Sequence, residues 1–261
     1  MPTIDLNADM GEGFGPWPMG DDAALLTLVT SANVACGAHA GDPVTMLATA
    51  RAAAAHGVAL GAHPGFPDLQ GFGRRELRMA PDEVHASVLA QVGALQAVAR
   101  AAGTKVGHVK PHGALYNMAA RDDALADAIA HAVRDADPAL VLVGLAGSVL
   151  VTAGARAGLR VAHEGFADRR YRADGTLVPR TAPHALIDDV DAAVAQAVAL
   201  ARGEGVVADD GTHVAVRCDT LCLHGDGAHA VAFARAIRGA LDAAGIAVAP
   251  FVVPGIAPRG A

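Results

Sequence analysis

The sequence predicts a single α/β domain, residues 1–261, built as a closed, TIM-like barrel of about seven parallel strands with helices between them. Strand and helix patterns alternate along the chain without a break in composition. Apolar residues make up 52% of the chain and aromatic residues only 3%, which favours helices packed closely on a parallel sheet. Polar residues gather at the C-terminal ends of most strands. An open doubly wound sheet would share this feature, but ligand-type residues follow nearly every strand instead of one crevice, which favours the barrel.

The first strand begins at Ile4 and ends in a turn rich in glycine. Its side chains alternate, so Asp5, Asn7 and Asp9 share one face and apolar residues occupy the other. A strand with polar groups in register and apolar groups behind it lines a hydrated space. Three alternating glycines follow and let the backbone turn sharply just past the strand end, carrying Glu12 with it.

The next two units repeat one order of features, in which a strand ends in glycine and histidine before a loop and a helix. The strand-like residues 31–39 end at His39, and Asp42 and Pro43 have the residue types of an N-cap and a first helical position. The third strand ends at His63. We expect strands at 31–39 and 58–63, helices at 23–29, 43–56 and 81–102, and a long loop at 64–79.

The second half of the chain continues the alternation. Residues 105–116 are expected to form the fourth strand and its exit, with His108, Lys110 and His112 on one face. A polar, arginine-rich loop at 166–183 has the length of a lid or a binding loop. Further elements are expected as strands at 139–147, 160–168 and 220–226, helices at 122–135, 148–158, 188–202 and 229–244, a turn-rich segment at 203–216 and an apolar tail at 246–253.

Several classes of function are disfavoured. A net charge of −7 and the lack of a basic run argue against a nucleic-acid surface. The sequence contains no GxGxxG, no GxxxxGK[ST] and no GxSxG, so it predicts neither nucleotide binding by this chain alone nor a serine nucleophile. No signal-like segment and no long apolar run occur, which favours the cytoplasm. The three cysteines do not form a disulfide framework, and we expect reduced, mostly buried thiols.

The candidates for chemistry are His, Asp and Glu residues at strand ends. They are Asp9, Glu12, His39, His63, His112, Glu164, Asp168, His224 and Asp226. In one mechanism, His39 and His63 with an acid from the first strand hold a divalent metal that activates water. In the other, carboxylates and histidines act as general acid and base without a metal. The sequence leaves both open.

Two cationic residues have alternative interpretations. Lys110 is one of only two lysines in the chain, and on an apolar strand its ammonium either reaches a carboxylate across the barrel or extends to the barrel mouth. Arg169 follows Asp168, and the two form either an ion pair that holds the next loop or part of a substrate site. A small anionic substrate would need Arg169, Arg180, Arg74 or Lys110 as its partner.

Long motifs occur in order through nearly the whole chain. They are Asp5-Leu-Asn-Ala-Asp-Met-Gly-Glu12, Ala32-Asn-Val-Ala-Cys-Gly37 with His39-Ala-Gly-Asp-Pro43, Gly61-Ala-His-Pro-Gly-Phe-Pro-Asp68 with Gly71-Phe-Gly-Arg-Arg75, Val109-Lys-Pro-His-Gly-Ala-Leu-Tyr-Asn117, Phe166-Ala-Asp-Arg169 with Tyr171, and His224-Gly-Asp226. In these motifs the chain resembles the LamB/YcsF family. The resemblance implies a seven-stranded β/α barrel similar to glycoside hydrolases and sugar deacetylases.

The same resemblance implies an activity and roles for residues. The activity is ATP-dependent opening of 5-oxoproline (pyroglutamate) to glutamate, carried out together with two further subunits, B and C, which would bind most of the ATP. Asp9 or Glu12 would be the base. Lys110, His112 and His224 would surround the carbonyl, and Arg169 would lie near the substrate carboxylate. The other expected substrate-binding residues are Asn7, His39, His63, Asp168, Tyr171 and Asp226.

Two other functions are compatible with the sequence. The His, His and Asp set at the strand ends would also suit a metal-dependent N-deacetylase of a small amide or amino sugar, which would work without ATP and without partners. A non-catalytic regulatory protein that only binds the other two subunits is the third hypothesis.

Overall fold

The structure is a computed structural model that describes residues 2–180, 182–223 and 230–252. Seven parallel strands pair in the order β1, β2, β3, β4, β5, β6 and β9, and β9 pairs with β1 as well as β6. They are β1 (Thr3–Met10), β2 (Ser31–Ala35), β3 (Ala59–His63), β4 (Val106–Val109), β5 (Val141–Leu145), β6 (Arg160–Phe166) and β9 (Thr220–Leu223). The sheet therefore closes, which confirms the barrel. That all of residues 1–261 form one domain stays a prediction.

An additional strand, β10 (Ala247–Val248), lies beside the start of β1. Thr3 and Ile4 pair with β10, and from Asp5 onward β1 pairs with β9 instead. The apolar tail expected at 246–253 thus contains a strand, which pairs with the N-terminal end of β1 before the residues where β1 meets β9. Apolar side chains stay in the core there, since Ile246 is buried.

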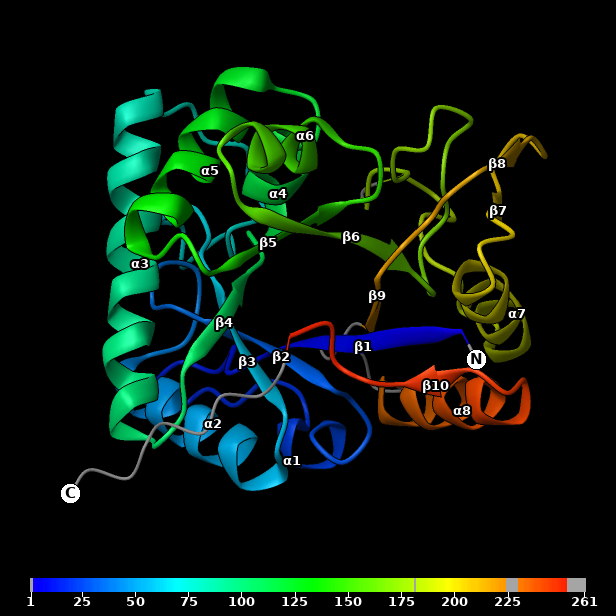
Figure 1. The fold of residues 1–261 in the computed structure, drawn as a ribbon, viewed down its shortest axis with the longest axis horizontal. Coiled ribbons are helices and arrows are strands. Elements are labelled where there is room, and N and C mark those ends of the chain that lie inside the picture. Colours follow the sequence, from blue (N-terminus) through cyan, green and yellow to red (C-terminus); the bar gives the residue numbers. More distant parts are fainter. Residues whose placement is uncertain (1, 181, 224–229, 253–261) are drawn as a thin grey trace.

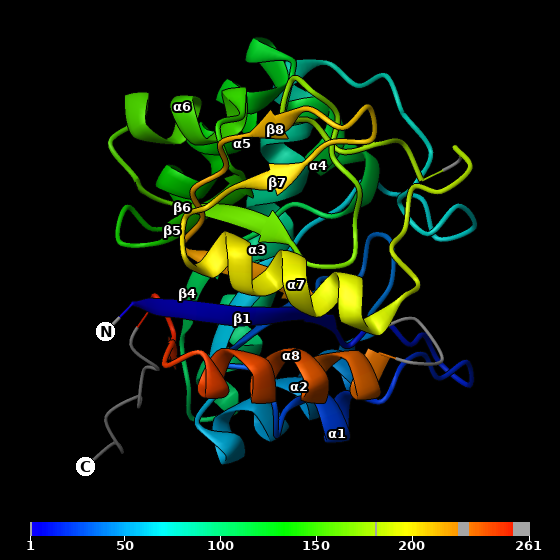
Figure 2. The same cartoon turned by 90° about the vertical axis from the view of Figure 1, so that its right-hand side faces the viewer.

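Helices surround the barrel in both views (Figures 1 and 2). They are α1 (Asp22–Leu25), α2 (Pro43–His56), α3 (Pro81–Ala101), α4 (Gly113–Ala119), α5 (Asp123–Ala136), α6 (Val149–Arg156), α7 (Val190–Ala201) and α8 (Ala230–Ala243). Their starts follow from local chemistry: the Asp42 carboxylate accepts a hydrogen bond from the Val44 N–H (2.9 Å), and Pro43 takes the first helical position. None of the helices in the described ranges is long and apolar enough to cross a membrane.

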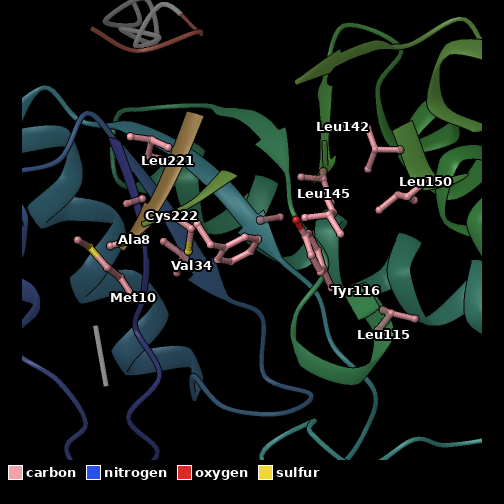
Figure 3. Packing of buried hydrophobic residues seen from close by; sticks show 14 of the residues in the cluster. Ala8, Met10, Val34, Leu115, Tyr116, Leu142, Leu145, Leu150, Leu221 and Cys222 are labelled. Atoms are coloured by element: carbon pink, nitrogen blue, oxygen red, sulfur yellow. The ribbon is translucent and has the colours of Figure 1, made fainter. Parts of the chain in front are cut away.

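The apolar core lies between the strands and the helices. Outward-facing strand residues such as Leu6 and Leu142 are fully buried there, together with Leu150 of α6, and Figure 3 shows part of this cluster. Alanine fills the helix faces, and the small side chains allow close packing on the sheet. The three cysteines are free thiols, as expected from the sequence.

Some element boundaries differ from the prediction, and glycine or proline explains most of the differences. The expected strand exit at 105–116 contains a helix, α4, because Pro111 cannot continue the ladder and Gly113 turns the chain at φ +56°. The strand expected at 31–39 ends at Ala35, since Gly37 adopts φ +93°. The turn-rich segment 203–216 contains a small hairpin of β7 (Val206–Val207) and β8 (His213–Val214).

Candidate active site

The inside of the barrel holds a hydrogen-bonded polar network beneath its C-terminal mouth. The Asn7 amide donates to Glu164 Oε1 (3.0 Å) and Thr220 Oγ1 (2.7 Å). The Asn33 amide donates to Asn7 Oδ1 (2.7 Å), and His108 Nε2 donates to Asn33 Oδ1 (2.8 Å). These hydrogen bonds stabilise the buried groups, because an unpaired buried polar group costs about 1–3 kcal/mol. His108 Nδ1 has no hydrogen-bond partner in the described ranges. Asn7, predicted to bind substrate, lies within this network, and its substrate-binding role stays a prediction.

Lys110 places its ammonium in the middle of this network. Nζ lies 2.9 Å from Glu164 Oε1, 3.0 Å from Asp9 Oδ1 and 3.2 Å from Asn7 Oδ1. The side chain is buried, so of the two interpretations of this lysine, the carboxylate across the barrel is the one observed. Burial alone would lower the pKa of Lys110, but Asp9 and Glu164 hold this pKa well above its ordinary value. Lys110 is therefore a fixed cation and does not act as a base.

Asp9 faces the mouth from the end of β1. Its Oδ1 accepts from Lys110 and from the Asn33 amide (2.9 Å), and its Oδ2 lies 3.3 Å from His63 Nε2. Burial raises the pKa of Asp9, but His63 and Lys110 outweigh this and hold the pKa well below its ordinary value. Its side chain is 15% exposed, against 8% for Glu12 and 0% for Glu164. Asp9 is thus an ionised carboxylate and the most accessible of these three.

Three histidines and one glutamate converge beside Asp9. Glu12, His39, His63 and His112 are all buried, and each offers one ligand atom within 4.8 Å of the others. His63 Nε2 and His112 Nδ1 are 2.9 Å apart, and Glu12 Oε1 lies 3.4 Å from His112 Nδ1 and 3.5 Å from His39 Nε2. Imidazole and carboxylate are the donors that bind Zn²⁺ and related divalent ions. The cluster can hold a divalent metal.

Two glycines leave room for the histidine rings. His39 and His112 stack in parallel with ring centroids 3.8 Å apart. A Cβ at Gly65 would lie 2.7 Å from His39 Nδ1, and one at Gly73 would lie 2.8 Å from His39 Cβ. Burial lowers the pKa of His39 well below its ordinary value and lowers the pKa of His112 to about 3. Both rings are therefore neutral imidazoles at neutral pH.

The loop between β3 and α3 is fixed at two points. The Gln91 side chain of α3 accepts from the Gly65 N–H (3.0 Å) and donates to the Gly65 carbonyl (2.9 Å). Further along, the Asp68 carboxylate pairs with the Arg75 guanidinium. Between these residues, Phe72 adopts φ +54°, a region that favours glycine, and its ring contacts those of His39 and His112 edge to face.

The loop after β6 carries three further predicted residues. Arg169 is buried, donates to the Val178 carbonyl (2.7 Å), and its Nε has no hydrogen-bond partner in the described ranges. Burial lowers the pKa of Arg169 to about 10, so it remains a cation. The Tyr171 hydroxyl accepts from the Phe166 N–H (2.8 Å), and Asp168 is half-buried. The roles predicted for these residues stay predictions.

The structure brings together half of the twelve residues predicted for the site. Six residues lie together, namely Asp9, Glu12, His39, His63 and His112 near the mouth and Lys110 just beneath them. Their catalytic and substrate-binding roles stay predictions. His224 and Asp226 lie outside the described residues.

Sequence reasoning missed some contributors to the site. Glu164 was a strand-end candidate without an assigned role, yet it is fully buried against Lys110, Asn7 and the Tyr116 hydroxyl (2.6 Å). Phe72 lies in the Gly-Phe-Gly sequence, where flanking glycines were the available signal for a tight turn. Gln91 gave no signal, because a single glutamine on a helix is usually solvated.

Comparisons with known proteins agree over almost the whole chain. A family model described as the LamB/YcsF family matches residues 4–254. A relative from Methylococcus capsulatus, named as the A subunit of 5-oxoprolinase, is 61% identical over 247 residues, which are 95% of this chain and 95% of that protein. The relative of the same name from Bacillus subtilis is 55% identical over 245 residues, 94% of this chain and 95% of that one. Among solved structures, the lactam utilization protein from Thermus thermophilus is similar with a TM-score of 0.91 at 50% identity, covering 95% of this chain and 100% of that chain.

Proposed function

This chain belongs to the LamB/YcsF family, and from that premise we propose that it is the A subunit of an ATP-dependent 5-oxoprolinase. The reaction opens the lactam of 5-oxo-L-proline (pyroglutamate) to L-glutamate. The observation that carries the proposal is the similarity, over at least 95% of both chains, to proteins named as the A subunit of 5-oxoprolinase. The fixed cation and the ionised carboxylate near the barrel mouth support it, because a base and a group that stabilises negative charge both accelerate the opening of an amide.

The chemistry sets clear demands on the site. The oxygen of a water molecule bonds to the lactam carbon, the carbon–nitrogen bond breaks, and the ring nitrogen leaves as an amine after gaining a proton. The amide is stabilised by resonance, so the attack needs a base and a stabilised oxyanion. The product also keeps its amine and its new carboxylate in one molecule, which favours ring closure. Coupling the reaction to ATP cleavage would overcome both obstacles.

The residues at the mouth fit these roles. Asp9 would take the proton of the attacking water, since it is ionised and is more exposed than Glu12. Lys110 would face the developing negative charge on the carbonyl oxygen, with His112 beside it. Arg169, whose Nε has no hydrogen-bond partner in the described ranges, would bind the substrate carboxylate.

ATP and the partner subunits belong to the same proposal. The sequence contains no phosphate-binding loop, so ATP would be bound mainly by subunits B and C. They would transfer the γ-phosphoryl group of ATP to the lactam oxygen, with ADP as the leaving group. Water would then add to the activated carbon, the ring nitrogen would leave as the amine, and hydrolysis of the resulting acyl phosphate by a second water would release inorganic phosphate. The lettered names of the relatives support a multisubunit enzyme. We expect the complex in the cytoplasm, where 5-oxoproline and ATP would both be available.

The proposal is tested by glutamate release from 5-oxoproline. The purified chain, the purified B and C subunits, and the mixture of all three are each assayed with and without ATP. We expect release only from the mixture with ATP. Release by the chain alone without ATP would overturn the ATP dependence. If a mixture that is shown to be folded and associated releases no glutamate, 5-oxoproline is not the substrate and the proposal is overturned.

The metal-dependent N-deacetylase remains the second candidate, because the cluster of Glu12 with three histidines suits it. It predicts acetate release from an N-acetylated amine or amino sugar by the chain alone. The assay above and this one separate the two functions, because only the 5-oxoprolinase requires ATP and partners.

A further inference from the structure

We propose that Glu12, His39, His63 and His112 form a binding site for one divalent transition metal ion of the Zn²⁺ class. His63 would bind through Nε2 and His112 through Nδ1. The inference goes beyond the lactam chemistry, because it follows from the hydrogen bonds and spacing of the histidine rings and is tested by metal binding alone.

The hydrogen bonds of His63 and His112 fix which ring nitrogen carries a proton. His63 Nδ1 lies 2.7 Å from the Lys110 backbone carbonyl, and His112 Nε2 lies 2.8 Å from the Phe72 backbone carbonyl. A carbonyl oxygen only accepts, so each of these nitrogens must donate an N–H. His112 Nδ1 is therefore unprotonated, and His63 Nε2 is unprotonated whenever the His63 ring is neutral.

These two unprotonated nitrogens face each other at 2.9 Å. Two lone pairs at this distance repel unless a positive charge lies between or beside them. They lie in a buried site, where such a mismatch is not relieved by water. A cation that both nitrogens coordinate removes the repulsion.

His39 and Glu12 supply the remaining donors. His39 is 1% exposed, and neither of its ring nitrogens has a hydrogen-bond partner in the described ranges. Its Nε2 lies 3.5 Å from Glu12 Oε1, which lies 3.4 Å from His112 Nδ1. Donors around a tetrahedral Zn²⁺ at about 2.1 Å are separated by about 3.4 Å. The spacings of 3.4 and 3.5 Å match this value and the spacing of 2.9 Å is shorter. The His39 ring stacks in parallel on His112, so it would rotate out of this stack for both rings to bind the same ion.

The surroundings also resemble the outer shell of a metal site. Histidine ligands usually donate their second N–H to a backbone carbonyl or a carboxylate, which fixes the ring. Phe72 holds its carbonyl toward His112 in a left-handed backbone conformation that is unfavourable for a non-glycine residue. The nearby pair of Asp68 and Arg75 fixes this loop. When bound, a divalent ion there would supply Lewis-acid activation of a water or a carbonyl oxygen.

The rival explanation is a proton in place of the metal. A doubly protonated His63 would donate to His112 Nδ1, and its charge would be balanced by Asp9 Oδ2 at 3.3 Å. This alternative predicts no metal binding. It differs from the proposal in a measurable way without any assay of activity.

The test uses the full chain, stripped with a chelator and dialysed. Zn²⁺ binding is measured by isothermal titration calorimetry and by elemental analysis after gel filtration, and Co²⁺ is added separately to record its visible absorption. We expect one Zn²⁺ per chain and the Co²⁺ bands of a four-coordinate site with nitrogen and oxygen donors. His63→Ala and His112→Ala should each weaken binding at least about 100-fold, since each removes a ligand.

His131→Ala is the matched control, because His131 is exposed on α5 and should leave binding unchanged. Wild-type protein that takes up neither Zn²⁺ nor Co²⁺ would overturn the proposal in favour of the shared proton. Unchanged binding in the folded double variant His63→Ala/His112→Ala would overturn it as well. If a variant does not fold, the Co²⁺ spectrum of the wild-type chain still decides between the metal and the proton.

Discussion

Replacing Lys110 with methionine should destabilise the fold strongly. The Lys110 ammonium lies 2.9 Å from Glu164 Oε1 and 3.0 Å from Asp9 Oδ1 in a buried network. Methionine has a similar length but no charge, so the change leaves two carboxylates without their cation and makes little cavity. Removing one partner of a buried ion pair costs about 3–5 kcal/mol. A domain is stabilised by about 5–15 kcal/mol in total, so the variant should lose a large part of its stability.

Equilibrium unfolding in urea, followed by circular dichroism, measures this loss. Lys105→Met is the matched control, because Lys105 is the other lysine of the chain and is exposed. We expect Lys105→Met to change the free energy of unfolding by no more than about 0.5 kcal/mol. Adding Glu164→Gln to Lys110→Met should recover part of the loss, since one buried charge disappears. A loss below about 1 kcal/mol in Lys110→Met would refute the argument that this ammonium balances the two carboxylates.

The pH dependence gives an independent check. The folded protein holds the pKa of Asp9 well below its ordinary value of 3.8. The stability that this carboxylate contributes is therefore present above about pH 4 and is lost as the pH falls through the lowered pKa. His63 supplies the largest favourable effect on this pKa and Lys110 the next, so without Lys110 part of that contribution is absent at every pH. The unfolding free energies of wild type and Lys110→Met should therefore converge below about pH 4.

Three further predictions concern the barrel interior. Burial raises the pKa of Asp5 to about 6, so the folded state holds this proton more tightly than the unfolded state does. The free energy of unfolding of the wild type should therefore fall by about 3 kcal/mol as the pH rises from about 4 to above 6. Asp5→Asn should remove this fall in urea unfolding curves. Gly61→Ala places a methyl group against the His108 ring and should lower the free energy of unfolding by about 1–3 kcal/mol or more. Gly93→Ala on α3 has open space around the new methyl group and should be neutral or stabilising by up to about 1 kcal/mol. Thermal unfolding of the two variants checks this contrast. Reductive methylation of the native protein should modify Lys105, which is exposed, and leave Lys110, which is buried, unmodified. Mass spectrometry that shows both lysines modified before unfolding would contradict the burial of Lys110.

The fold was largely predictable because its main signals are local. Alternation on β1 placed Asp5, Asn7 and Asp9 on the inner face, and the Asp42-Pro43 pair marked the start of α2. The pairing of β10 with β1 was not predictable, because a two-residue strand has no periodicity of its own. Helix α4 was missed because its start lies directly behind a strand and a proline.

The site was predictable in its members and much less in its contacts. Histidines at the ends of successive strands had to converge once the barrel closed, and His39, His63 and His112 do so. Which ring nitrogen carries the proton depends on the carbonyls of Lys110 and Phe72, and a sequence does not show where a backbone carbonyl points. The partners of Lys110 were likewise hidden, because Glu164 comes from a strand far away in the chain.

The central claim is that the barrel mouth carries out the lactam opening within a complex. Glutamate release by the complex of this chain with subunits B and C, with ATP and 5-oxoproline, is compared between wild type and Asp9→Asn. Asp209→Asn serves as the control, because that side chain is exposed. We expect Asp9→Asn to lower turnover by about 100-fold to 10,000-fold, as loss of a general base does, with the complex still assembled by gel filtration. Wild-type turnover in the assembled Asp9→Asn complex would show that the chemistry takes place elsewhere and would contradict the account.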